Sequence, residues 1–129
     1  MRIRLVVLLL LLVSMLSAGI RETLRDYRPI GIKEITNYNA VVAQCDSEPD
    51  IGAYGRVAVA GKPTGNWAAC NFLPFRTRFI IPSLTGNTIW EVRDRTAKKV
   101  GHRIDLLFPL DRKNIGLRKA EVFIVEVKK

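Results

Sequence analysis

The chain is poor in the residues that most metal sites require, because it holds one histidine and two cysteines among 129 residues. His102, Cys45 and Cys70 form no recognisable ligand spacing, so we expect neither a metal nor another cofactor. Acidic residues are also few, with 12 Asp and Glu against 21 Lys and Arg, and the formal net charge is +9. A surplus of this size predicts an anionic partner.

Long apolar runs are absent beyond the N-terminus, and no later segment is expected to span a bilayer. Two arginines precede an apolar stretch from Leu5 to Leu16, and small residues follow up to Gly19. This pattern predicts a signal peptide over residues 1–19 and an exported protein, either secreted or held in the cell envelope. The alternative is an uncleaved anchor, in which case this segment alone would touch the membrane.

Export bears on the oxidation state that we expect for the two cysteines. An even pair in an oxidising compartment favours a disulfide between Cys45 and Cys70. It would close a loop of about 25 residues and contribute about 3 kcal/mol on the loop-entropy model. Two buried free thiols are the alternative.

Export also narrows the choice of anionic partner. Loss of Arg2 and Arg4 with the signal takes two charges from +9 and leaves +7. An exported protein seldom meets nucleic acid, and the basic residues are scattered without interleaved aromatic residues. We therefore expect no nucleic-acid partner and favour peptidoglycan and its anionic wall polymers, bound by a monomer. A basic surface that is merely solvated is the alternative.

Short candidate strands broken by turn residues predict an all-β domain over residues 34–128. Six strands in fewer than 100 residues favour a small closed barrel, because closure removes exposed edges. The expected strands are Glu34–Val42, Arg56–Ala60, Thr77–Ile81, Thr88–Arg93, Ile104–Phe108 and Ala120–Val127.

Helix is expected at two places only. Residues 20–33 form a polar lead-in, in which Leu24 and Tyr27 start a short helix that Pro29 ends. The other candidate is Asp111–Ile115, with the aspartate as a possible N-cap.

The stretch "DRTAKKVGHRID" places Asp94 and Asp105 at the two ends of a basic loop. Strand alternation puts Asp94 on the same face as Trp90 and Val92, towards the core. If the two carboxyl groups approach each other in apolar surroundings, at least one pKa rises, as a general acid requires. The alternative is that each aspartate caps a turn or pairs with a neighbouring arginine. His102, within the loop, is more simply a solvent-facing side chain.

Several stretches together resemble the three-aspartate (3D) domain, the catalytic core of the membrane-bound lytic transglycosylase A family. "EVRDRTAKKVGHRIDLLF" (91–108) resembles its signature, and Gly101–Asp105 matches the end of that signature. "ITNYNA" (35–40), "CDSEPDIGAYG" (45–55) and "AACNFLPFRTRFIIP" (68–82) resemble further segments in the right order. The set is more specific than any one piece.

The resemblance covers about Glu34 to Val127 and implies a double-psi β-barrel that cleaves the glycan strand of peptidoglycan. It gives Asp105 the role of single acid/base and makes Asp94 its supporting carboxylate. The implied product carries a 1,6-anhydro-muramyl end. The resemblance also makes four residues candidates for substrate binding, namely Tyr38, Tyr54, Asn71 and Lys99.

Some residues depart from the family pattern. Asn71 stands where the family has its remaining aspartate, Arg76 where it favours glycine, and Gly52 and Tyr54 replace residues of its turn. These changes favour an alternative function, that of a non-catalytic module that binds wall glycan or loosens the wall as expansins do.

Overall fold

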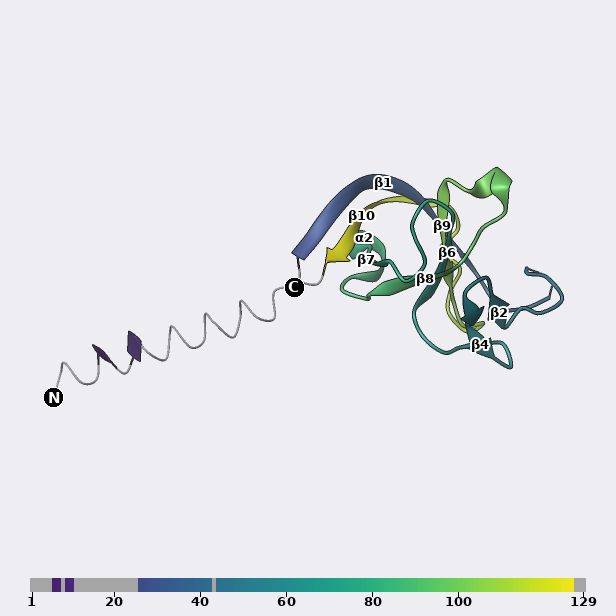
Figure 1. The fold of residues 1–129 in the computed structure, drawn as a ribbon, viewed down its shortest axis with the longest axis horizontal. Coiled ribbons are helices and arrows are strands. Elements are labelled where there is room, and N and C mark those ends of the chain that lie inside the picture. The colour runs from purple at the N-terminus through teal and green to yellow at the C-terminus, as the bar shows by residue number, and fades with distance from the viewer. Residues whose placement is uncertain (1–5, 8, 11–25, 43, 127–129) are drawn as a thin grey trace. The chain divides into compact units, whose positions relative to one another are not determined.

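Six strands close into a barrel in the computed structural model, which describes residues 6, 7, 9, 10, 26–42 and 44–126 (Figure 1). The predicted all-β class and small closed barrel are confirmed. One compact unit spans Tyr27–Val125. The barrel strands are β1 (Asp26–Tyr38), β6 (Trp67–Cys70), β7 (Arg78–Ile80), β8 (Trp90–Asp94), β9 (Arg103–Leu107) and β10 (Arg118–Glu126).

The strands follow one another around the barrel in the order β1–β10–β7–β8–β6–β9. β1 pairs with β9 in parallel, as β6 does with β8, whereas β7 is antiparallel to both β8 and β10. The order around the barrel is unchanged when β1 is exchanged with β8, β6 with β9 and β7 with β10. The same exchange maps the parallel pair β1–β9 onto the parallel pair β8–β6. Two interlocked halves related in this way agree with the double-psi barrel that the resemblance implies.

The elements between the barrel strands are short. Two hairpins lie between β1 and β6, and each joins strands of two residues: β2 (Ile51–Gly52) with β3 (Gly55–Arg56), and β4 (Ala58–Val59) with β5 (Lys62–Pro63). The helical elements are α2 (Pro82–Thr85) and the 3-10 helix η1 (Lys98–Val100).

The predicted signal peptide, residues 1–19, lies almost wholly outside the described residues, which include only positions 6, 7, 9 and 10 of that range. Within the described part of the chain, no helix is both long and apolar enough to cross a bilayer.

Two hydrophobic clusters lie on opposite faces of the sheet. The inner cluster draws on all six barrel strands and therefore fills the barrel. Its largest side chains, Trp90, Phe79 and Phe108, are almost fully buried, and each contributes about 1.5–3 kcal/mol relative to exposure. The outer cluster lies on the other face and comprises Tyr38, Ala40, Val57, Ala58, Ala69 and Leu107.

β9 shows how the two clusters arise from one strand. Ile104 and Leu106 belong to the inner cluster, whereas Leu107 belongs to the outer cluster. The strand is apolar on both faces because the barrel interior covers one and the outer cluster covers the other. Asp105 therefore lies on the outer face, next to apolar neighbours.

The expected helices are wrong where the structure describes them, and Leu24 lies outside the described residues. Tyr27 and Pro29 belong to β1, which starts at Asp26, and a proline is tolerated near the start of a strand. Residues 111–115 form turns and irregular structure. Asn114 there accepts a hydrogen bond from the Gly116 amide at 2.7 Å, a local bond that competes with helix.

Several short elements were not predicted, among them β2, β5 and η1 as well as β6 and α2. β6 has only four residues, two of them alanine, which has low strand propensity, although three of the four are buried. Helix α2 is a single turn that begins at Pro82, where a missing amide costs nothing.

The expected disulfide is wrong, because Cys45 and Cys70, both within the described residues, are free. Cys70 is fully buried in the inner cluster, whereas Cys45 packs against the outer cluster. The Cys45 thiol instead donates a hydrogen bond to the Asn39 carbonyl oxygen at 3.4 Å. The two sulfur atoms thus face different hydrophobic clusters.

We predict two reactive thiols once the protein is denatured. Alkylation without reductant should add two alkyl groups to the intact mass, because unfolding exposes both Cys45 and Cys70. An unchanged mass would show that the two cysteines are bonded in the purified protein. Alkylation of the folded protein should modify Cys45 first, since only that thiol is partly exposed.

Candidate active site

A β-bulge brings Asp94 and Asp105 onto the same face of the sheet. The pairing of β6 with β8 shifts by one residue, so that Ala68 pairs with Val92 but Ala69 pairs with Asp94. Arg93 is the extra residue. The expectation that Asp94 shares the face of Trp90 and Val92 is therefore wrong.

Ala69 lies between the two aspartates. Its Cα pairs with Asp94 on one neighbouring strand and with Asp105 on the other. Two strand spacings put the Cα atoms of the aspartates roughly 10 Å apart. Because Ala69 has only a methyl group, the space between the two carboxyl groups is left open.

Backbone amides hold the Asp94 carboxylate. Its Oδ1 accepts hydrogen bonds from the amides of Ala53 and Arg95, both at 2.8 Å. Gly52, just before Ala53, packs so closely that a Cβ there would lie 3.1 Å from Asp94 Cγ and 2.9 Å from the Arg93 carbonyl oxygen. Two amide donors to one carboxylate oxygen fix the position of this side chain.

Asp105 has a drier environment. Burial raises the pKa of its carboxyl group, and the charge of Asp94 raises it further. A hydrogen bond from the Thr36 hydroxyl to Asp105 Oδ1, at 3.0 Å, and the charge of Arg103 act against this rise. The two carboxyl groups thus differ in environment, because Asp105 is desolvated and Asp94 is held by backbone amides.

Both aspartates line an open pocket of about 520 Å3 beside the outer cluster. Tyr38 and Ala69 contribute to it, as do Cys45 and the backbone around Gly52. Its charged lining residues are mostly acidic, although the protein as a whole is basic: Asp46, Glu48, Asp94, Asp105 and Arg95. A neutral, hydroxyl-rich group fits such a pocket better than an anion.

Asn71 fixes the loop between the aspartates. Its Nδ2 donates to the Thr96 carbonyl oxygen at 2.9 Å, and its Oδ1 accepts from the Thr96 amide at 2.7 Å. Gly101, near the other end of the loop, packs against the same side chain. Asn71 was expected to bind substrate; in the structure it holds the loop, and an aspartate has no amide to donate.

We predict that Asn71→Asp, which introduces the residue type of the 3D domain that the sequence resembles, lowers the free energy of unfolding by about 1–3 kcal/mol at neutral pH. The carboxylate would face the Thr96 carbonyl oxygen without a proton to donate. Chemical denaturation of both proteins measures the change. Asn71→Ser, which also loses the paired bonds but adds no charge, is the control and should cost less. Equal stability of the aspartate variant and the parent would contradict the role of the amide.

A row of aromatic and arginine side chains lies beside the pocket. The Arg93 guanidinium stacks on Trp67 at 4.6 Å and on Tyr54 at 5.2 Å, and Tyr54 contacts the Phe75 ring at 5.1 Å. Arg95 lies 3.7 Å from the centre of the Phe75 ring. Tyr54, expected at the substrate, is thus part of this row rather than of the pocket lining.

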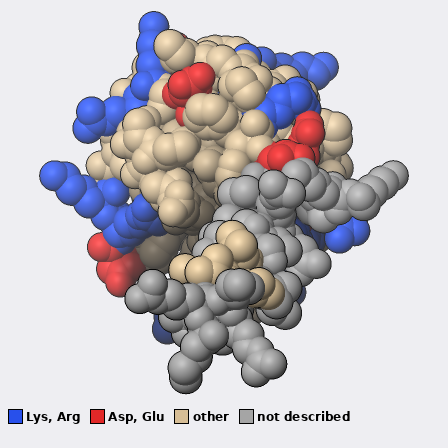
Figure 2. Space-filling model, turned by 90° about the vertical axis from the view of Figure 1, so that its left-hand side faces the viewer, with Lys and Arg blue, Asp and Glu red and all other residues tan. Residues whose placement is uncertain are grey.

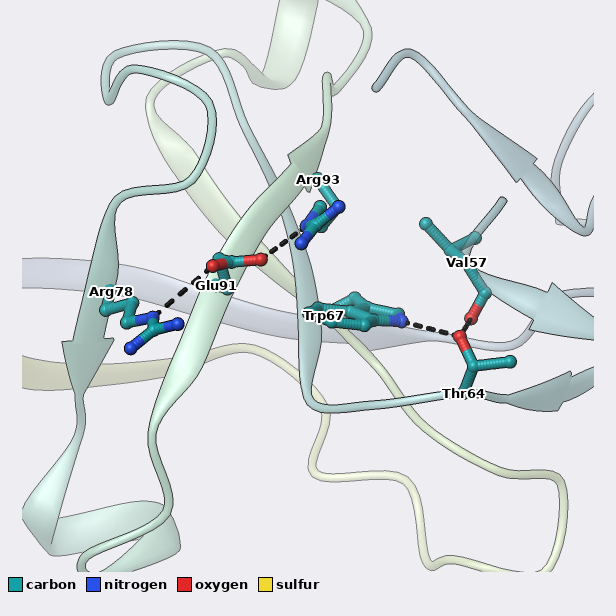
Figure 3. A network of polar contacts seen from close by, with 6 residues as sticks. All are labelled: Val57, Thr64, Trp67, Arg78, Glu91 and Arg93. Atoms are coloured by element: carbon teal, nitrogen blue, oxygen red, sulfur yellow. Dashed lines mark hydrogen bonds and ion pairs between the residues drawn. The ribbon is translucent and has the colours of Figure 1, made fainter. Parts of the chain in front are cut away.

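Figure 3 shows how this row is anchored. Glu91, which is buried, pairs with Arg93 on one side and with Arg78 on the other. The Trp67 indole N–H donates to the Thr64 hydroxyl at 3.0 Å, and that hydroxyl donates to the Val57 carbonyl oxygen. Glu91 offsets one of these two arginine charges, so a positive charge remains in this network.

Two other residues of the loop, Lys99 and His102, lie away from the pocket lining. Lys99 is exposed on η1. His102 Nε2 lies 2.6 Å from Glu34, a partly buried carboxylate whose pKa Arg103 and His102 lower. The structure therefore brings together Asp94, Asp105 and Tyr38 of the predicted site, but not Lys99.

Sequence reasoning missed two residues of the site. Thr36 reaches Asp105 only because β1 and β9 pair in parallel, with Thr36 opposite Asp105. Ala69 matters through its small size and its place between two strands. The sole signal for Thr36 was its place in "ITNYNA", two residues before Tyr38.

The described residues include no group of three His, Cys, Asp or Glu side chains that would hold a metal ion. Basic residues do not gather in one patch on the face drawn in Figure 2, where Lys and Arg project at several separate places with carboxylates between them. Such a surface favours diffuse attraction to a polyanion over a defined anion site.

No protein-family model matches this chain, and no curated protein matches it either.

Proposed function

We propose that the protein is a lytic transglycosylase that cleaves the glycan strand of peptidoglycan. The observation that carries the proposal is the pair of carboxyl groups on either side of Ala69, one desolvated and one held by backbone amides. The resemblance to the 3D domain supplies the reaction type.

In the proposed reaction, Asp105 starts as the carboxylic acid and donates its proton to the glycosidic oxygen while the bond to the anomeric carbon breaks. The resulting carboxylate accepts the proton of the muramic acid C6 hydroxyl as its oxygen bonds to the anomeric carbon. The product is a 1,6-anhydro sugar, Asp105 is again protonated, and no water is consumed. Because the nucleophile is internal, no second carboxylate has to activate water.

Asp94 would act as the permanent anion of the pair. Its negative charge stabilises the positive charge that develops on the sugar ring in the transition state. It also favours the protonated form of Asp105 at the start of the reaction. The acidic pocket would admit a neutral sugar ring, whereas the basic outer surface would attract the anionic polymer around it.

A second candidate, a non-catalytic module that binds wall glycan, is favoured by one observation. Asn71 occupies the position of the family's third aspartate and bonds only to the loop backbone. The aromatic row beside the pocket would suit sugar binding under either function.

Incubation of purified glycan strands with the protein, followed by mass spectrometry, tests the proposal. We expect new 1,6-anhydro-muramyl ends. If the folded protein binds insoluble wall but yields no new ends, the binding function takes its place.

A further inference from the structure

The Tyr38 hydroxyl is in an unusual position. The side chain is only 9% exposed, and its hydroxyl is enclosed without a hydrogen-bond partner among the described residues. Leaving a buried polar group unpaired is costly, and nearly all such groups in proteins have a partner. Packing alone therefore does not explain why a hydroxyl group is buried at this position.

The surroundings of Tyr38 point to the acid pair. Tyr38 follows Thr36 by two residues on β1, so both side chains lie on the outer face, and Thr36 is already bonded to Asp105. The ring packs in the outer cluster with Ala69, the residue between the two aspartates. Burial raises the pKa of the phenol, and the charges of Asp94 and Asp105 raise it further. The hydroxyl is thus protonated at neutral pH, close enough to both aspartates to respond to their charges.

Asp105 has fewer hydrogen-bond donors than an ionised carboxylate can accept, whereas the Tyr38 hydroxyl has no acceptor. An ionised carboxylate accepts hydrogen bonds at both oxygens, and the structure gives Asp105 one side-chain donor, the Thr36 hydroxyl on Oδ1. Asp94, in contrast, has two backbone amide donors. The enclosed hydroxyl is not reached by solvent, which favours a neighbouring carboxylate over a bound ligand as its acceptor.

We propose that Tyr38 is a positioning residue whose hydroxyl donates a hydrogen bond to the Asp105 carboxylate when Asp105 is ionised. The structure does not contain this bond, so its formation requires a rotation of at least one of the two side chains. When Asp105 is protonated it needs this donor less, and the hydroxyl is left unpaired.

This inference refines the role that the proposed function gives Asp105 and in that sense rests on it. Asp105 must be an acid in the first step and a carboxylate in the second. A donor that bonds only to the ionised carboxylate stabilises the second state. It thereby limits the rise in the pKa of Asp105 that burial causes. The inference can be tested without substrate. An absence of glycan cleavage would therefore refute the proposed function but not the hydrogen bond of Tyr38 to Asp105, which a titration tests separately.

Titration of the Asp105 carboxyl carbon by NMR, in the parent and in Tyr38→Phe without substrate, is the test. The phenylalanine ring fills the same space but has no donor. We expect the pKa of Asp105 to be about one to two units higher in the variant. An unchanged pKa would overturn the inference.

The other charged and titratable groups near Asp105 are the same in both proteins: Arg103 on β9, Asp94 on β8 and Cys45 in the loop after β1. Thr36→Val, which removes a donor present in the structure, should also raise the pKa of Asp105. Tyr27→Phe, at an exposed position of β1, should leave it unchanged.

A measurement on the parent protein makes the test independent of whether the variant folds. The resonance of the Tyr38 ring carbon that bears the hydroxyl should shift over the pH range in which Asp105 titrates. A constant resonance over that range would overturn the inference even if the variant failed to fold.

Discussion

Replacing Asp105 with asparagine is expected to lower the rate of glycan cleavage by about 100- to 10,000-fold, because the variant has no proton to transfer. The amide has nearly the same shape as the carboxyl group and can still accept the hydrogen bond from Thr36. The fold should therefore persist. Release of anhydro-muramyl ends, followed over time at equal protein concentration, measures the change.

The stability of the same variant should depend on pH in a defined direction. Burial raises the pKa of Asp105 above its ordinary value of 3.8 in the folded state. The folded protein therefore binds this proton more tightly than the unfolded chain does, and it loses stability as pH rises through the folded pKa. Asp105→Asn lacks this loss, so its stability relative to the parent should increase as pH rises across that range.

Glu34→Gln is a matched control for charge removal. Glu34 lies opposite Arg103 on the neighbouring strand and pairs with it, but it is not part of the pocket lining. Its replacement should leave cleavage nearly unchanged. If Asp105→Asn, folded by circular dichroism, cleaves glycan as fast as the parent, Asp105 is not the acid.

Replacing Gly52 with alanine is expected to lower cleavage by about 100-fold and the free energy of unfolding by about 1–3 kcal/mol. The added methyl group would lie 2.9 Å from the Arg93 carbonyl oxygen and 3.1 Å from Asp94 Cγ. One of these groups is backbone, so the strand end that carries Asp94 has to move. A larger side chain such as threonine would be more disruptive still.

Gly86→Ala separates the loss of activity from the loss of stability. Gly86 ends α2 with φ of 57°, and a methyl group there would meet nothing within 4 Å. It should cost about 1–2 kcal/mol through backbone strain alone, with cleavage unchanged. If Gly52→Ala retains full cleavage, close packing at Gly52 does not position Asp94.

The barrel could be predicted from the sequence because most of its strands are bounded by turns. β7, β8, β9 and β10 lie close to the expected ranges. β6 could not be predicted, since four residues with two alanines show no periodicity. Its place between β8 and β9, which aligns the aspartates, depends on long-range pairing that no local pattern encodes.

The two aspartates of the candidate site could be predicted from the sequence, but their geometry and several of their neighbours could not. The spacing of Asp94 and Asp105 in a loop with apolar flanks suggested a pair, and both aspartates do line one pocket. The reason given for Asp94 was wrong, because strand alternation does not reveal a bulge at Arg93. The role of Asn71 depends on a contact with Thr96, 25 residues further along the chain.

Cleavage of glycan strands in water enriched in oxygen-18 is the most direct test of the proposed mechanism. A lytic transglycosylase uses the C6 hydroxyl of its own substrate as the nucleophile, so we predict anhydro-muramyl ends that contain no oxygen-18. New reducing ends that carry the label would show hydrolysis and contradict the single-acid mechanism. Folded protein that yields no new ends at all would contradict cleavage itself.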